Sequence, residues 1–489
     1  MKLVNEAQIT PQPIDSFARI LGTGSVERLR EQAQEVRGRL AGRVIWNVNS
    51  TAAGGGVAEM LQTLLGYAQG LGIDARWLVI SGEPDFFRIT KRLHNALHGE
   101  AGDGTRLDDA ARSAYERMTA KNTAEIHNYI RPGDIAIIHD PQPAGMIPDL
   151  VKKGVGVAWR CHIGNDARNG EDREAWAFLQ PYLTQAHAFI FSRFSYLPDV
   201  LYHGRCLVVS PSIDPFSPKN QEMDEATRHA ILHHTGLVNG TAVGGPRTFV
   251  RPDGSSATVE RRAEVVREGP PPSWDTPLVV QVSRWDALKD PTGVLQGFVK
   301  AMTLPGVDGA HLMLVGPNVH AVTDDPEGKE TFDRVMHHWQ TLPTEQRSRI
   351  HLVNLPMDDL QENAAMVNAL QRHAAVVVQK SLREGFGLTV TEAMWKARPL
   401  IASAVGGIQD QIDHGVSGLL LRNPTNLDAF AGAVSQLLCN PGLAARLGRN
   451  AMRRVAKNFI GTRIVAMYDD LVERLEHDPH GVEFSSSHR

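Results

Sequence analysis

Residues 374–397 read AAVVVQKSLREGFGLTVTEAMWKA. The apolar run at the start predicts a buried β-strand that ends near Ser381. The residues around Thr391 favour a helix, so we expect a helix to begin near Gly387 or Leu388, directly after a glycine-rich turn. A strand, a turn and a helix in this order form the repeating unit of α/β folds with parallel sheets. The stretch therefore predicts that fold class.

The start of this helix is suited to binding an anion. The amides from Gly387 to Thr389 have no partner inside the helix, and the helix dipole adds a partial positive charge. Gly385 and Gly387 let a ligand come close to the backbone. Two carboxylates, Glu384 and Glu392, lie eight residues apart and could accept hydrogen bonds from neutral hydroxyls. The alternative is a solvated glutamate pair around an ordinary strand–helix turn.

A second segment supplies positive charge. The sequence QVSRWDALKDP places Arg284 and Lys289 five residues apart, just after an apolar run. Arginine can engage two phosphate oxygens at once, and lysine acts as a point charge. The position of the pair at the carboxyl end of a predicted strand favours phosphate binding over an ordinary surface pair.

The same order of elements recurs along the chain. Apolar runs that end in polar or glycine residues occur within 42–57, 73–82, 133–145, 156–166, 188–198 and 205–215. A second set occurs within 277–291, 310–319, 349–356, 374–387, 398–407 and 417–422. Such runs, separated by helical segments, are typical of parallel sheets covered on both faces. Ligands of such sheets bind at the carboxyl ends of the strands. We expect an α/β protein with two Rossmann-like domains that face a cleft.

The domain boundaries follow from this pattern. The first domain is expected over residues 1–212 and the second over 213–457. The amphipathic segment at about 458–478 is expected to be a helix that returns to the first domain. A Pro-Asp-Gly turn with alternating flanks predicts a β-hairpin inserted at about 240–270. The tail, 479–489, is expected to be disordered.

Three polar clusters follow strands of the first half. Gly54, Gly55 and Gly56 form a glycine loop between a strand and a helix, but neither a Walker A loop nor a regular GxGxxG motif is present, so a nicotinamide site is poorly supported. The other clusters are HDPQP (139–143) and RCHIGND (160–166). A single histidine in such a place is usually a satisfied core residue. Three clusters in one half favour a ligand site instead.

Composition excludes several classes of protein. The 489 residues carry a net charge of −4, with 42% hydrophobic and 22% charged residues, and no long run of one charge. This argues against a protein that binds nucleic acid or a membrane surface. No run reaches the roughly 18 apolar residues of a membrane span, and the first residues lack the apolar core of a signal peptide, so a cytoplasmic location is expected. The three cysteines are far apart and are expected to be reduced core residues.

Taken together, the motifs resemble those of the retaining glycosyltransferases of GT-B architecture, over about residues 40–475. The segments IIHDPQPAG, WRCHIGND, SPSIDPFSPKN, VSRWDALKD and SLREGFGLTVTEAMWK are similar to those of trehalose glycosyltransferring synthases. The related retaining trehalose phosphorylases share much of this pattern. The hairpin at about 240–270 departs from the shorter members of the group.

The resemblance implies roles for individual residues. Glu384 would contact the donor glucose, and Glu392 would hold the ribose of the nucleotide. The diphosphate would be bound by Arg284, Lys289 and the helix start at Gly387, Leu388 and Thr389. His162 would lie beside the 6-hydroxyl of the donor glucose. Gly55 and Gly56 would line the cleft near the phosphate or the acceptor, and Asp140 and Gly54 would face the acceptor.

The implied activity is the transfer of glucose from a nucleoside-diphosphate glucose to glucose, which gives α,α-trehalose with retention. No cofactor and no metal are implied, because the basic side chains and helix amides neutralise the diphosphate. The expected partners are small molecules, with a homodimer possible and with no nucleic acid or membrane. Three alternatives stay open at this point: a trehalose phosphorylase, a retaining transferase with another acceptor, and a non-catalytic sugar- or nucleotide-binding protein. The residues do not reveal the base of the donor.

Overall fold

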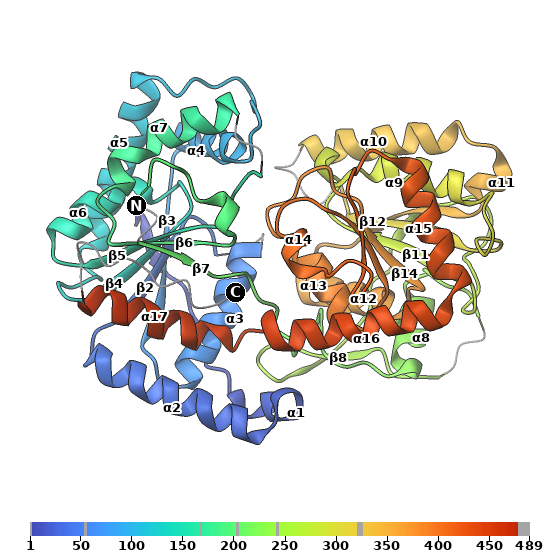
Figure 1. Ribbon diagram of the computed structural model, residues 1–489, viewed down its shortest axis with the longest axis horizontal. Coiled ribbons are helices and arrows are strands. Elements are labelled where there is room, and N and C mark those ends of the chain that lie inside the picture. Colours follow the sequence, from blue (N-terminus) through green and yellow to red (C-terminus); the bar gives the residue numbers. More distant parts are fainter. Residues whose placement is uncertain are drawn as a thin grey trace. The chain divides into compact units, whose positions relative to one another are not determined.

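The computed structural model describes residues 2–52, 56–166, 169–201, 205–240, 244–319 and 326–477. The chain divides into two compact units (Figure 1). Unit 1 consists of Met1–Ser212 and Gly461–Arg489, and unit 2 consists of Ile213–Ile460. Each unit is built around one seven-stranded sheet. The architecture is the α/β class with two parallel-sheet domains that the strand pattern predicts.

The sheet of unit 1 has the order β1-β3-β2-β4-β5-β6-β7. Its strands are β1 (Val4–Glu6), β2 (Ile45–Asn49), β3 (Ala75–Ile80), β4 (Ile135–His139), β5 (Gly156–Cys161), β6 (Ala188–Phe191) and β7 (Cys206–Val208). All pairs are parallel except the edge pair β1·β3. The edge strand β1 was not predicted. With β2 as the first parallel strand, the order begins 2-1-3-4-5, which is the flavodoxin-like order.

Helices cover both faces of this sheet. They are η1 (Ile14–Phe17), α1 (Ala18–Leu21), α2 (Thr23–Leu40), α3 (Gly56–Gly70), α4 (Pro84–Leu97), α5 (Asp109–Ile126), η2 (Ala144–Met146), α6 (Ile147–Lys152), α7 (Gly170–Leu183), η3 (Phe194–Tyr196) and α17 (Arg463–His477). Alternate residues of β4 enter opposite core clusters, with Ile137 on one face and Ile138 on the other. The apolar side of α17 contributes Val465, Tyr468 and Leu471 to the cluster that contains Ile137. The last described helix therefore completes the core of unit 1.

The sheet of unit 2 has the order β10-β13-β12-β11-β14-β15-β16. Its strands are β10 (Glu264–Val266), β11 (Leu278–Val282), β12 (His311–Pro317), β13 (Ile350–Leu355), β14 (Val376–Gln379), β15 (Leu400–Ser403) and β16 (Leu419–Leu421). Numbered from β11, the parallel strands have the order 3-2-1-4-5-6, which is that of the Rossmann fold. The two units are thus doubly wound in two different orders.

The helices of unit 2 lie on both faces of its sheet. They are α8 (Glu225–His234), η5 (Ala287–Lys289), α9 (Pro291–Ala301), α10 (Pro326–Gln340), α11 (Thr344–Arg347), α12 (Leu360–His373), α13 (Leu388–Trp395), α14 (Ile408–Gln411), α15 (Leu427–Cys439) and α16 (Pro441–Asn458). The alternating residues Val279 and Val280 of β11 are both fully buried. Burial on both faces explains why its strands read as continuous apolar runs.

The inserted segment contains the expected hairpin. Strands β8 (Thr248–Val250) and β9 (Ser256–Thr258) pair antiparallel across the Pro-Asp-Gly turn. A further strand, β10, was not predicted, and it pairs antiparallel with the edge strand β13. The insertion therefore extends the main sheet of unit 2.

Two other sequence-based expectations concern the cysteines and the lack of a membrane span. Cys161 is buried, but Cys439 is exposed, so the expectation that all three cysteines lie in the core was wrong. The tail 479–489 lies outside the described residues. Among the described helices, none has the length and apolarity needed to cross a bilayer.

Each sheet has one point where the strand order reverses direction. In unit 2 this switch point lies between β11 and β14, and in unit 1 it lies between β2 and β4. Ligands of doubly wound sheets bind outside the carboxyl ends of the strands at such a point. The loops that follow these four strands are therefore where a site is expected.

Candidate functional site

The switch point of unit 2 brings Lys289 and Glu384 together. Lys289 ends the short helix η5 after β11, and Glu384 lies in the loop after β14. The Lys289 ammonium donates a hydrogen bond to Glu384 Oε2 at 2.7 Å, and the side chains are 16% and 12% exposed. Ser381 Oγ also donates to Glu384 Oε2, at 3.4 Å. An ammonium has three donors, so Lys289 keeps two for another acceptor.

Arg284 lies on the same loop as Lys289 but is oriented differently. Its side chain is 68% exposed, and its guanidinium contacts Asp286 at 3.2 Å. Asp286 also caps η5, because its carboxylate accepts from the amide of Leu288 at 2.8 Å. In the loop after β11, the Arg284 side chain is therefore largely exposed to solvent, whereas Lys289 is paired with the carboxylate of Glu384.

Helix α13 begins at Leu388, as predicted, and its N-cap is Gly387. Gly387 has φ 85° and ψ 62°, a left-handed conformation that favours glycine. A Cβ at this position would lie 3.1 Å from Glu384 Cγ and 3.1 Å from Ile408 Cγ1. The turn is also tied to its neighbours, because Gln411 Nε2 donates to the carbonyl of Phe386 at 2.5 Å. The first amides of α13 are thus held rigidly beside Glu384.

Glu392 lies on α13 and is only 5% exposed. Its Oε1 is 3.5 Å from the ammonium of Lys219, while its Oε2 is buried and has no hydrogen-bond partner in the part of the chain that the structure describes. Lys396, one turn further along, is fully buried and donates to Asn220 and Gln371 instead. An unpartnered carboxylate oxygen is costly, so Glu392 has the capacity for one more donor.

A second ion pair at this switch point was missed in the sequence. Lys380 follows β14 directly, is 1% exposed, and donates to Asp290 Oδ2. Asp290 is also the N-cap of α9, where its carboxylate accepts from the amide of Gly293. The pair joins the loops after β11 and β14. The sequence signal that could have indicated this pair is a lysine placed directly after a buried strand.

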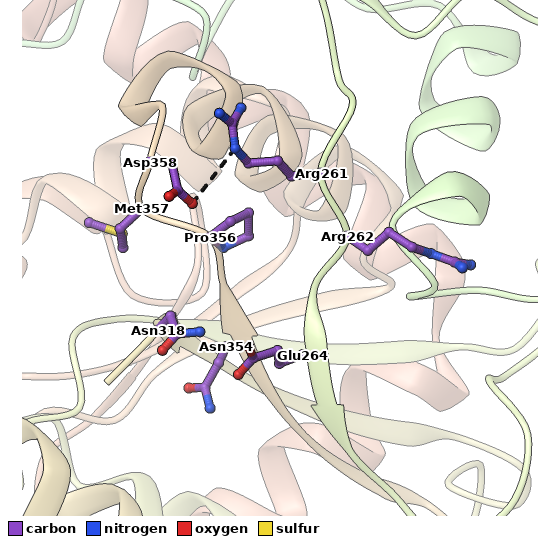
Figure 2. Close-up of a pocket in the computed structure, with 8 residues that line it drawn as sticks. All are labelled: Arg261, Arg262, Glu264, Asn318, Asn354, Pro356, Met357 and Asp358. Carbon is purple, nitrogen blue, oxygen red and sulfur yellow. Dashed lines mark ion pairs between the residues drawn. The ribbon is translucent and has the colours of Figure 1, made fainter. Parts of the chain in front are cut away.

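A pocket of about 340 Å³ lies beyond the carboxyl ends of β12 and β13 (Figure 2). It is lined by Arg261, Arg262, Glu264, Asn318, Asn354, Pro356, Met357 and Asp358. Arg261 Nε is 3.6 Å from Asp358 Oδ2, and Asn354 Oδ1 accepts from Trp285 Nε1 at 2.8 Å. Sequence reasoning missed this pocket because part of its wall comes from the unpredicted strand β10.

The switch point of unit 1 contains His139 at the end of β4, Asp140 directly after it and His162 after β5. His139 Nδ1 lies 3.0 Å from His162 Nε2, and Asp140 Oδ1 accepts from the backbone amide of His162 at 2.8 Å. Burial and the nearby Arg160 lower the pKa of both histidines well below the usual value. Both rings are therefore neutral near pH 7. His139 was predicted only as part of a polar cluster.

Asp140 combines an unusual backbone with an unusual charge state. Its φ is 62°, a conformation that aspartate tolerates better than most residues. Burial raises the pKa of Asp140 from 3.8 to about 7, against the opposing effects of the amide of His162 and of Arg160. Its carboxyl can therefore donate or accept a proton near neutral pH.

The glycine loop of unit 1 is described only in part. Gly54 and Gly55 lie outside the described residues, and Gly56 is the exposed first residue of α3. No group of three or more His, Cys, Asp or Glu side chains in the described ranges is arranged to hold a metal ion.

Comparison with known proteins agrees with this geometry. Residues 47–198 match the family model described as trehalose synthase, N-terminal domain, and residues 274–454 match glycosyl transferases group 1. An α,α-trehalose-phosphate synthase (UDP-forming) from Burkholderia xenovorans, solved with glucose-6-phosphate, has a similar structure, with a TM-score of 0.63 and 16% identity, covering 88% of this chain and 98% of that one. The two doubly wound units and these matches define a glycosyltransferase of the GT-B class.

Relatives that match most of this chain narrow the class. A trehalose synthase from Pyrococcus horikoshii is 34% identical over 96% of this chain and 99% of its own. A trehalose phosphorylase from Pleurotus sajor-caju is 28% identical over 92% of this chain and 60% of its own. The chain therefore belongs to the trehalose synthase family.

Proposed function

We propose that this protein transfers glucose from a nucleoside-diphosphate glucose to free glucose and forms α,α-trehalose with retention of configuration. The observation that carries the proposal is the Lys289–Glu384 pair beside the start of α13, at the switch point of unit 2. It combines a cation, a carboxylate and helix amides, which suit a diphosphate joined to a sugar. Family membership supports trehalose as the product.

The residues of unit 2 would hold the donor. The two remaining donors of Lys289, the exposed guanidinium of Arg284 and the amides of Leu388 and Thr389 would bind the diphosphate. Glu384, oriented by Lys289, would accept hydrogen bonds from glucose hydroxyls. No metal is needed in this scheme, because these groups neutralise the charge that develops on the leaving phosphate.

Two further parts of unit 2 would bind the nucleoside. Glu392 has a buried oxygen available for a ribose hydroxyl. The pocket at β12 and β13 would receive the base. It lies on the same edge of the sheet as Lys289 and is about two strand spacings away, roughly 10 Å, which a ribose and a diphosphate bridge.

Unit 1 would supply the groups for the sugars. Asp140 would contact the acceptor, as would Gly54, and His162 would lie at the 6-hydroxyl of the donor glucose. Gly55 and Gly56 would approach the phosphate. In the reaction, the bond between glucose C1 and the phosphate oxygen breaks, and the acceptor oxygen bonds to C1 from the same face. The acceptor's proton passes to the leaving phosphate oxygen, so the protein contributes positioning and charge stabilisation.

The proposal is tested with the purified full chain, glucose and each of ADP-, UDP- and GDP-glucose in turn. We expect proton NMR to show α,α-trehalose with at least one donor, in the presence of EDTA as well as without it. The Glu384→Gln variant is the matched control and should lose turnover. Formation of a β-linked product, or of a disaccharide with another acceptor only, would contradict the proposal.

A second candidate is a trehalose phosphorylase, which the similarity to the Pleurotus enzyme favours. In that reaction inorganic phosphate would replace the nucleotide at Lys289 and the start of α13. Incubation with trehalose and phosphate, without nucleotide, separates the two. Release of glucose 1-phosphate would support the phosphorylase, and its absence together with turnover of a nucleotide sugar would support the synthase.

A further inference from the structure

Three side chains in unit 1 form a hydrogen-bonded row that ends at His162. Asn47 lies on β2, His139 ends β4, and His162 follows β5, so the row crosses three neighbouring strands. Asn47 Oδ1 lies 3.0 Å from His139 Nε2, and His139 Nδ1 lies 3.0 Å from His162 Nε2. The two imidazole planes differ by only 4°, with centroids 5.3 Å apart, as an in-plane bond between two rings requires.

The direction of every hydrogen bond in this row follows from the contacts of Asn47, which is its inner end. Asn47 Nδ2 faces the carbonyl oxygen of Arg76 at 3.5 Å and the hydroxyl of Tyr468 at 3.4 Å. A carbonyl oxygen can only accept, so the amide nitrogen must lie on that side and the amide oxygen must face His139. That oxygen also only accepts, and His139 Nε2 therefore carries a proton.

The proton on His139 Nε2 then determines which nitrogen of His162 is protonated. His139 is fully buried and neutral, so a proton on Nε2 leaves Nδ1 as an acceptor. His162 Nε2 must donate to it. Because His162 is also neutral, its Nδ1 is left with a free lone pair, and this atom makes no hydrogen bond within the described residues.

We propose that His139 and Asn47 are positioning residues that hold His162 in the Nε2–H tautomer, so that His162 Nδ1 accepts a hydrogen bond from a hydroxyl of the donor sugar. The identity of that sugar rests on the proposed function, whereas the tautomer does not. The consequence is directional. His162 Nδ1 accepts the hydrogen bond, so the sugar hydroxyl must donate it. A sugar that lacks this hydroxyl leaves the lone pair of Nδ1 without a partner.

The surroundings keep the row neutral. The charged and titratable groups that face it are Arg160 and Cys161 on β5, Asp140 after β4, and Tyr468 on α17. Arg160 lowers the pKa of both histidines, and its own guanidinium contacts the sulfurs of Met467 and Met60. A cation held in the core beside two imidazoles opposes their protonation.

The tautomer can be observed directly. The full chain is labelled with ¹⁵N-histidine, and the side-chain signals of His162 and His139 are assigned from the spectra of His162→Gln and His139→Gln. At pH 7 we expect both rings to carry their proton on Nε2. A His162 ring protonated on Nδ1, or on both nitrogens, would overturn the proposal whether or not the protein turns over any donor.

Kinetics with two donors distinguish a role of His139 in positioning His162 from a merely structural role. The active nucleoside-diphosphate glucose is compared with its 6-deoxy analogue. In His139→Phe, which removes the acceptor for His162, kcat/KM for the glucose donor should fall about 10-fold, the lower end of the effect known for groups that orient a metal-binding histidine. The value for the 6-deoxy donor should stay nearly unchanged. His139→Gln retains a side-chain acceptor and should recover most of the discrimination.

The chain offers a matched control. His311, which is half-buried, and His351, which is buried, lie at the starts of β12 and β13 and form another histidine pair, with Nδ1 and Nε2 2.9 Å apart. His351→Phe removes an equivalent bond at the opposite end of the strands and should leave the ratio of the two donors unchanged. An equal loss for both donors in His139→Phe would show a structural role only. If that variant does not fold, the NMR measurement and His139→Gln still decide the question.

Discussion

The two units place different kinds of groups at their switch points. In unit 2 the groups are ionic: Lys289 pairs with Glu384, Lys380 with Asp290, and Arg284 extends into solvent. In unit 1 the groups are neutral or nearly so, because burial and Arg160 suppress the charge of His139 and His162, and burial raises the pKa of Asp140 to about 7. Two sheets of the same type thus carry different sites, one ionic and one neutral.

This difference suggests a division of labour. A diphosphate requires fixed positive charge, which unit 2 provides. A sugar hydroxyl requires aligned donors and acceptors, and a neutral row of side chains provides these without attracting a competing ion. We therefore expect variants in unit 2 to act through charge, and variants in unit 1 to act through hydrogen-bond direction and pH.

The largest effect is expected at Lys289. Lys289→Met should lower turnover by about 10²–10³, because charge develops on the leaving phosphate in the transition state. Arg284→Ala should behave similarly. Near-normal steady-state kinetics in either variant would contradict the expectation that unit 2 acts through charge. Lys300→Met, which removes an exposed lysine paired with Asp428, is the control and should leave turnover unchanged.

Stability should separate the two functions of Lys289. Removing it takes away the ammonium that pairs with the carboxylate of Glu384, which is 12% exposed, so Lys289→Met should also lose about 1–3 kcal/mol of stability. The double variant Lys289→Met/Glu384→Gln removes the negative charge of that carboxylate as well. It should regain that stability in urea denaturation without regaining turnover. A double variant that remains equally unstable would show that Lys289 supports the loop through other contacts.

The next effect is expected at Glu392. Glu392→Gln should weaken binding of the nucleoside diphosphate by about 10–100-fold, since hydrogen bonds to charged groups contribute roughly 1.5–3 kcal/mol. Turnover at saturating donor should change less. Isothermal titration calorimetry with the free nucleoside diphosphate measures the affinity, and an unchanged value would remove Glu392 from the ribose. Lys219→Met tests whether the contact to Oε1 at 3.5 Å orients the carboxylate.

Much of this architecture could be predicted from the sequence. All of the described parallel strands lie within the predicted segments, and the start of α13 at Leu388 was predicted from glycine and helix-forming residues alone. These features depend on local composition and on burial of both sheet faces. The strand order 2-1-3-4-5 in unit 1 could not be predicted, because order is set by packing between distant segments.

The site was predictable in its residues but not in its connections. Lys289 and Glu384 were both singled out, yet the bond between them depends on β11 and β14 being neighbours in the sheet, which no local pattern specifies. The same holds for His139, whose partner His162 lies 23 residues away, directly after the next strand β5. Edge strands such as β1 and β10 are three residues long and carry too little periodicity to be recognised.

A smaller effect is expected at Gly387, which gives unit 2 its left-handed turn. Gly387→Ala places a Cβ 3.1 Å from Glu384 Cγ in a backbone conformation with φ 85°. The substitution should cost roughly 1–2 kcal/mol of stability, and turnover should fall because Glu384 moves. Gly415→Ala is the control, since Gly415 has φ 77° but open space around it. It should lose similar stability in thermal unfolding and keep full turnover.

The smallest effect concerns the pH dependence of stability, and it has opposite signs in the two units. Burial raises the pKa of Asp140 in unit 1 from 3.8 to about 7. The unfolded chain keeps the ordinary value, so folding takes up a proton between about pH 4 and pH 7, and stability falls as the pH rises through that window. Asp140→Asn cannot ionise, and asparagine tolerates the φ of 62°. The variant should melt about 2–4 °C higher at pH 8, with the gain vanishing towards pH 4.

In unit 2 the hydrogen bond from Arg251 lowers the pKa of Asp359 from 3.8 to about 2. Here the stabilisation is fully present above about pH 4 and is lost as the pH falls through about 2. Asp359→Asn keeps an N-cap for α12 but removes the charge, so it should melt lower at pH 8 and approach the parent protein at low pH. Calorimetry of both variants across pH 2–8 measures the two slopes. If both variants shifted stability in the same direction, the buried Asp140 and the arginine-paired Asp359 would not differ in environment, and the contrast between these two acids would fail.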